Sequence, residues 1–181
     1  MVDDKAGQVA VSRRIKAAAS DIFHVLIDPK SHLAMDGSGM VRESVSDTSV
    51  SAVGDVFVIK MYHVEHGDYE MNNHVVEYEQ DRRFGWAPEA GRGHPDASGP
   101  EAGRRWGQRW IYDLVPDGPE ATIVTEIYDC SGVADDDRVT MDDGRIWIEA
   151  HDEDIGTPRP LVHPAGGRRE PIVERLATAL R

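Results

Sequence analysis

The chain has 181 residues, of which 40% are hydrophobic and 29% charged, and these ordinary globular values exclude a fibrous or wholly disordered chain. Its 33 acidic and 20 basic residues give a net charge of −13, which excludes nucleic acid as an expected partner because phosphate binding needs a basic surface. Cys130 is the only cysteine, so no intramolecular disulfide forms, as is typical of a reducing compartment. The sequence has neither a secretory leader pattern nor an apolar run of membrane-helix length. We therefore expect a single cytoplasmic domain over residues 1–181, without membrane insertion.

The N-terminal segment changes period once. Residues 9–15 alternate apolar and polar side chains, as a half-buried strand does. The apolar spacing then becomes helical, and we expect this helix to have Ser20 as its N-cap and to end before Pro29, since the residue preceding proline is disfavoured in the α region. A second short helix is expected over residues 31–35, followed by a loop.

Residues 40–130 have the pattern of strands almost throughout. The first long strand, residues 53–64, is apolar on both faces, which indicates a sheet that is covered on both sides or lines an interior. Residues 66–68 are expected to form a turn before an antiparallel return strand. Residues 87–105 are rich in glycine and proline without periodicity, and we interpret them as a disordered surface loop, with a functional loop as the alternative. The further strands are expected at residues 69–78, 84–86, 106–115 and 121–130.

The last third has two interpretations. Residues 139–155 could form a hairpin that turns at an Asp-Gly pair, or a helix with acidic residues in its first turn. We favour the helix, because Trp147, His151 and Ile155 then share one stripe. The following segment is rich in proline and glycine, and Pro171 opens a final short helix.

The order of these elements resembles a known superfamily. The residues that carry the resemblance are 11–29, 32–41 with its Asp-Gly-Ser-Gly, 53–57, 83–86 (Arg-Phe-Gly-Trp), 110–116 and 122–125. In this order they resemble the polyketide cyclase/dehydratase, START-like (SRPBCC) superfamily over residues 9–155. The resemblance implies an α+β helix-grip fold, as in the birch-pollen allergen, in which a curved antiparallel sheet wraps a long C-terminal helix and encloses an apolar cavity. The chain departs from this pattern at residues 156–181, where prolines and glycines would interrupt the last helix.

A set of apolar and aromatic side chains is expected to line the interior of such a sheet. Ligand pockets typically combine walls of this kind with a few polar groups, although core packing is the alternative for any single residue. We therefore hypothesise that the protein binds or transports a small hydrophobic or lipid-like molecule. The candidate lining residues are Phe57, Ile59, Met61, His63, Phe84, Trp86, Trp110, Tyr112, Leu114 and Tyr128.

Two other functions remain open. A polyketide aromatase/cyclase or dehydratase could use His63 as a base and Glu126 or Tyr112 as the proton donor, if burial adjusts their pKa values. A protein-interaction module would instead use the acidic surface to attract a basic partner. The pattern is compatible with a monomer or a homodimer.

No metal or cofactor is expected. His63, His66 and His74 lie near one hairpin, but their spacing matches no standard zinc motif, and His63 and His66 would point to opposite faces of a strand. The acidic runs at residues 135–137 and 152–154 lack the ligand spacing of a calcium loop. Cys130 has no identifiable base beside it, so a nucleophilic role is not expected either.

Overall fold

A single antiparallel sheet forms the body of the protein. The computed structural model describes residues 2–5, 7–36, 39–65 and 67–134. In this part of the chain eight strands form one sheet in the order β1-β2-β8-β7-β6-β5-β4-β3, and every neighbouring pair is antiparallel. The strands are β1 Val2–Lys5, β2 Gln8–Ile15, β3 Val41–Ser44, β4 Val56–His63, β5 Gly67–Glu79, β6 Arg83–Ala90, β7 Arg109–Pro116 and β8 Thr122–Asp129.

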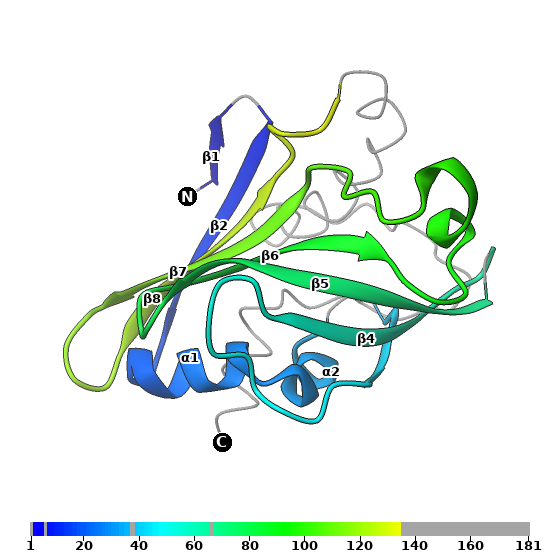
Figure 1. Ribbon diagram of the computed structural model, residues 1–181. Helices are drawn as coiled ribbons and strands as arrows, with labels where there is room; N and C mark the ends of the chain where they lie inside the picture. The colour runs from blue at the N-terminus through cyan, green and yellow to red at the C-terminus, as the bar shows by residue number, and fades with distance from the viewer. Residues whose placement is uncertain (1, 6, 37–38, 66, 135–181) are drawn as a thin grey trace.

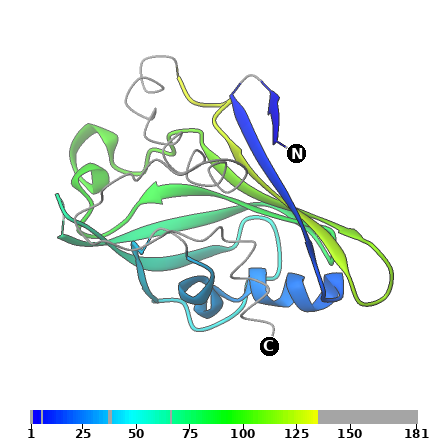
Figure 2. The ribbon, with the colours of Figure 1, turned by 180° about the vertical axis from the view of Figure 1, so that it is seen from behind.

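Two short helices pack against one face of this curved sheet (Figure 1). They are α1, Ala19–Ile27, and α2, His32–Met35, and the 3-10 helix η1, Pro29–Ser31, joins them. The view from behind shows the same layering, with both helices on one side of the strands (Figure 2). The sheet and the two helices match the α+β class expected from the sequence. No helix in the described ranges is long and apolar enough to cross a membrane.

Helix α1 is held by its apolar stripe. Ile22, Phe23 and Leu26 are almost completely buried, and the Phe23 ring meets the ring of Phe84 edge-on with centroids 6.4 Å apart. The expected N-cap at Ser20 is wrong: the N-cap is Ala18, two residues earlier, whose carbonyl accepts the first hydrogen bonds, and no side chain caps the helix. Packing of the stripe therefore positions this helix without a side-chain cap.

The first long hairpin is shifted from the positions expected. Strand β4 begins at Val56 rather than at residue 53, because the Asp55 carboxylate accepts the backbone N–H groups of Ser51 and Ala52 and closes a turn there. At the other end, Gly67 already belongs to β5, so the expected turn at residues 66–68 is also displaced.

The interpretation of residues 87–105 as a disordered loop is wrong. The first four of these residues continue β6, and the others include two single-turn 3-10 helices, η2 Pro95–Ala97 and η3 Gly99–Glu101. Pro88 lies inside β6 opposite Asn73 of β5, beyond the last residue that β6 pairs with β7. Proline provides no ladder N–H, and a strand paired on one side only tolerates that loss.

The final part of the expected fold lies outside the described residues. This applies to the C-terminal helix of the helix-grip pattern, to the choice between hairpin and helix at 139–155, and to the tail at 156–181.

Candidate functional site

The ten candidate lining residues share one face of the sheet. Directly opposite residues of an antiparallel pair lie on the same face, and Tyr112 pairs with both Phe84 and Glu126. Trp110 pairs in the same way with Trp86 and Tyr128. The candidates on β4 alternate with outward residues and join this face through their partners on β5. Helices α1 and α2 cover part of the same face, which we call the inner face.

The inner face has a packed part and a less covered part. Phe57, Ile59, Phe84 and Leu114 are at most 3% exposed and form the hydrophobic core with α1, so these four residues serve as ordinary core. The remaining apolar candidates are only half-buried, with the exception of Tyr112. They are Met61, Trp86, Trp110 and Tyr128.

Aromatic rings extend from the core into the less covered part. The ring of Trp86 stacks on that of Tyr112 with centroids 5.8 Å apart and an interplanar angle of 22°. Next to them, the rings of Trp110 and Tyr128 lie 4.6 Å apart. These flat apolar surfaces fit hydrocarbon or ring systems, and aromatic contacts of this kind contribute about 0.5–1.5 kcal/mol each beyond their buried area.

Tyr112 and Glu126 form a hydrogen-bonded pair at the boundary between the packed part and the less covered part of the inner face. The Tyr112 hydroxyl donates to Oε1 of Glu126 over 3.1 Å, and the two residues are 1% and 8% exposed. The other carboxyl oxygen, Oε2, is buried and has no hydrogen-bond partner among the described residues. A buried polar atom left without a partner costs about 1–3 kcal/mol, so a hydrogen-bond donor that reached this oxygen would recover part of that cost.

Burial sets the protonation of the pair. It raises the pKa of Glu126 from 4.5 to about 7, against the opposing effect of the Tyr112 hydrogen bond. Burial also raises the pKa of Tyr112 well above its ordinary value, and the charges of Glu126 and Asp36 add to that increase. Near neutral pH, therefore, both protonation states of Glu126 are populated, while Tyr112 stays protonated.

The structure does not bring His63 to this pair. His63 lies opposite Gly67 of β5, whereas Tyr112 is in register, through Phe84, with Tyr78 near the other end of that strand. At about 3.3 Å per residue, the strand between these two positions is about 35 Å long. The expected pairing of His63 as a base with Glu126 or Tyr112 is therefore not present, although Tyr112 and Glu126 themselves do meet.

The histidines of the first hairpin do not form a metal site in the described part of the chain. His74 pairs with Val56 and so faces away from His63, and its Nε2 lies 2.9 Å from a carboxyl oxygen of Glu89. His66 lies outside the described residues. Within the described ranges no three histidine, cysteine or acidic side chains are grouped closely enough to hold a metal ion.

Two buried polar residues at α2, which packs on the inner face, were not anticipated from the sequence. His32 of α2 is 8% exposed, donates from Nε2 to the Leu26 carbonyl over 2.9 Å, and contacts the ring of Trp86. Burial lowers the pKa of His32, so its ring is neutral at pH 7. Asp36 follows α2, is 9% exposed and accepts the N–H of Val41. Helical spacing places His32 beside Met35, and that apolar stripe is the signal that could have identified its burial.

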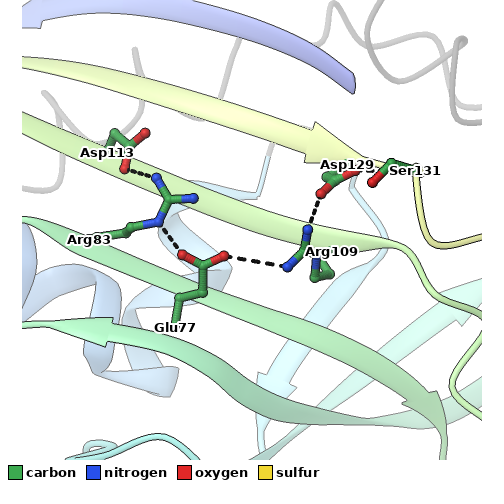
Figure 3. Close-up of polar contacts among 6 residues, drawn as sticks. All are labelled: Glu77, Arg83, Arg109, Asp113, Asp129 and Ser131. Atoms are coloured by element: carbon green, nitrogen blue, oxygen red, sulfur yellow. Dashed lines mark hydrogen bonds and ion pairs between the residues drawn. The ribbon is translucent and has the colours of Figure 1, made fainter. Parts of the chain in front are cut away.

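The opposite, outer face carries a network of paired charges (Figure 3). The Arg83 guanidinium bridges the carboxylates of Glu77 and Asp113, Glu77 also lies 3.5 Å from Arg109, and Arg109 pairs with Asp129. These residues come from β5, β6, β7 and β8, so the network links four neighbouring strands. Its charges satisfy one another, which leaves the inner face as the candidate site.

Comparisons with known proteins agree with the fold and do not identify an activity. No family model matches the chain. The uncharacterised protein Rv0088 of Mycobacterium tuberculosis is 30% identical over 129 residues, which are 71% of this chain and 50% of the relative. A second M. tuberculosis protein, MT0096, is also uncharacterised and is 29% identical over the same share of each chain. The chain thus spans half the length of these curated relatives.

Solved structures share the fold at low sequence identity. A protein of Arthrobacter aurescens has a TM-score of 0.61 at 13% identity, over 99% of this chain and 90% of its own. Ms6760 of Mycobacterium smegmatis has a TM-score of 0.59 at 9% identity, over 99% and 93% of the two chains. NE0264 of Nitrosomonas europaea has a TM-score of 0.56 at 12% identity, over 98% and 96%. At these identities the similarity concerns the fold alone.

Proposed function

We propose that this protein binds a small, largely apolar molecule against the inner face of its sheet, next to Glu126. One observation carries the proposal: half-buried aromatic rings adjoin a buried carboxyl group that has one oxygen without a partner among the described residues. Binding sites typically combine an apolar wall with a few polar groups that orient the ligand. A core that held no ligand would gain stability from an apolar residue at position 126.

The same proposal places the chain in the polyketide cyclase/START-like superfamily. Support comes from the order of elements, in which a strand and two short helices precede a run of antiparallel strands. The curved sheet with both helices on its inner face provides further support. Fold by itself does not define activity, so the binding function rests on the residues of the inner face.

Binding of an uncharged apolar fluorophore tests the function. We expect saturable binding of diphenylhexatriene, and we expect Trp110→Ala to weaken it about tenfold because the aromatic surface that Trp110 forms with Tyr128 is lost. The matched control is Trp106→Ala, since Trp106 is also half-buried but contacts His94 in the segment before β7. The absence of saturable binding, or equal losses in both variants, would contradict the proposal. Native mass spectrometry of the protein as purified from cells would identify a bound molecule directly.

Acid–base catalysis is a second candidate function. The observation that favours it is the hydrogen bond between Tyr112 and Glu126, combined with burial that raises the pKa of Glu126 to about 7. A carboxylate of this kind abstracts a proton at neutral pH, and a neighbouring tyrosine hydroxyl can return one, as a cyclase or dehydratase requires.

Extraction of bound molecules separates the two functions. If the protein is a dehydratase, the wild type and Glu126→Gln should hold molecules that differ by the mass of one water. If it is a binding protein, both should hold the same molecule. Mass spectrometry of organic extracts from the two purified proteins makes the comparison.

A further inference from the structure

We infer that the molecule bound on the inner face carries a hydroxyl group that hydrogen-bonds to Oε2 of Glu126. This inference rests on the proposed function and specifies the ligand as a neutral, apolar alcohol or phenol. It stands on the geometry of one buried carboxyl group: Oε1 accepts from Tyr112, and Oε2 is without a partner among the described residues.

In the described ranges, no residue beside Glu126 donates a hydrogen bond to Oε2. Across the ladder it is flanked by Val11 on one side and by Tyr112 on the other. Along β8, the residues that share its face are Val124 and Tyr128. Val124 is fully buried, and the ring of Tyr128 packs at a tilt against the Trp110 indole, so both neighbours offer chiefly apolar surface.

The charged and titratable groups near the pair favour a neutral ligand. Asp36, at the end of α2, is close enough for its charge to affect Tyr112, and Glu126 is itself an acid. A carboxylate or phosphate ligand would therefore meet two acidic groups. Arg13, further along β2, donates to the carbonyl of Ser12, and no cation among the described residues affects the pKa of Glu126. A protonated amine would have to form a buried ion pair with the Glu126 carboxylate, and removing both charges from water is costly.

A hydroxyl group suits Glu126 in both of its protonation states. It donates to Oε2 when the carboxyl group is ionised, and it accepts from Oε2 when that oxygen is protonated. An ether only accepts, and therefore pairs with the protonated form alone. The ratio of the affinities for an alcohol and for the matching ether therefore reports on the hydrogen bond between the ligand and Oε2 of Glu126.

Three probes with the same naphthalene ring and a small substituent at position 2 test the inference by calorimetry: 2-naphthol, 2-methoxynaphthalene and 2-methylnaphthalene. At pH 8 we expect wild-type protein to bind the naphthol about tenfold more tightly than the methyl compound, as one hydrogen bond to a charged group provides. The Glu126→Leu variant should still bind both 2-naphthol and 2-methylnaphthalene, but with no preference for the naphthol. Thr125→Val, which changes the adjacent outer-face residue, should retain it.

Glu126→Gln provides a test that does not depend on the folding of the leucine variant. The naphthol and the ether are both neutral between pH 6 and pH 8. In the wild type, the preference for naphthol over the ether should rise several-fold across this interval as Glu126 loses its proton. In Glu126→Gln the preference should not change with pH.

The outcomes separate this inference from the proposed function. If wild-type protein binds the naphthol and the methyl compound equally well, the hydroxyl contact is overturned and the apolar site stands. If none of the three probes binds, both proposals fail. If the naphthol preference is unchanged in Glu126→Leu, the hydroxyl group binds elsewhere and the inference is overturned.

Discussion

Burial, rather than a neighbouring charge, determines the proton affinity of Glu126. Its pKa rises from 4.5 to about 7, and the hydrogen bond from Tyr112 offsets only part of the increase. A change of this size corresponds to about 3 kcal/mol between the two protonation states. Because the folded pKa lies above the unfolded one, the folded protein binds the proton more tightly than the unfolded chain does.

Glu126→Gln should therefore change how stability depends on pH. Glutamine resembles the protonated acid and does not titrate. Below pH 4.5, where Glu126 is protonated in both states, variant and wild type should have similar free energies of unfolding. Between pH 4.5 and pH 7 the wild type should lose stability relative to the variant, by up to about 3 kcal/mol above pH 7. Urea unfolding at pH 4.5, 6 and 8 measures the difference, with Glu79→Gln at an exposed position as control. A difference independent of pH would contradict the raised pKa.

Tyr112→Phe should lower the free energy of unfolding by about 1–3 kcal/mol. The substitution removes the donor to Oε1, so that both oxygens of a buried carboxyl group are left without partners among the described residues. The control is Tyr78→Phe, because the Tyr78 hydroxyl has no hydrogen-bond partner in the described part of the chain and its ring lies on the same face. Equal urea midpoints for both variants would contradict this role of the hydrogen bond.

At the scale of elements, the two faces of the strands have different functions. Inner-face residues pack against α1 or carry the candidate site, and outer-face residues link β5 to β8 through ion pairs (Figure 3). Asp129 shows how strongly the outer network depends on pairing, because its side chain is completely buried. Burial alone would raise its pKa, but hydrogen bonds from Ser131 and Arg109 lower it overall.

Arg109→Met should destabilise the protein by about 2–4 kcal/mol, because it leaves the buried Asp129 carboxylate without its cation. Arg92→Met is the matched control: Arg92 also pairs with an acidic residue, Glu70, but its side chain is 81% exposed. Exposed pairs contribute at most about 1 kcal/mol. Thermal unfolding of the two variants measures the contrast, and similar losses would refute the importance of burial.

At the scale of the whole molecule, the strands in the described part of the chain form an open sheet with β1 and β3 at its two edges. Strand β3 has four residues and a register irregularity against β4, whereas β7 pairs along its whole length with β8. A second irregularity, between Val75 and Glu77 of β5, inserts one residue and bends the strand. Such features allow the sheet to curve around the helices.

Hydrogen exchange should follow this arrangement. We expect the amides of β7 to exchange at least about 100-fold more slowly than those of β3, because central strands open only with the global unfolding of the domain. Deuterium uptake measured by mass spectrometry on the full chain tests this expectation. Equal protection of β3 and β7 would show that the edge opens together with the centre.

Periodicity alone predicted much of this arrangement. Alternation along β4, β6, β7 and β8 predicts which of the ten candidate residues share a face within each strand, because successive side chains of a strand point to opposite faces. The apolar stripe of α1 and its end before Pro29 were also predicted, since both depend on local chemistry. Two boundaries were wrong: the first strand residue at Val56, which the local turn closed by Asp55 sets, and the course of residues 87–105, where the first four residues pair with β5.

The sequence by itself determined which residues face inward and in what order the elements occur, since both follow from spacing along the chain. Only the tertiary structure decided which inward residues meet. Register placed Tyr112 beside Glu126 and left His63 near the far end of the hairpin, although all three had been grouped as candidates. Packing then buried Glu126 and raised its pKa to about 7. The physical reason is that hydrogen bonds and desolvation depend on neighbours from other strands and helices, which spacing along one segment does not contain.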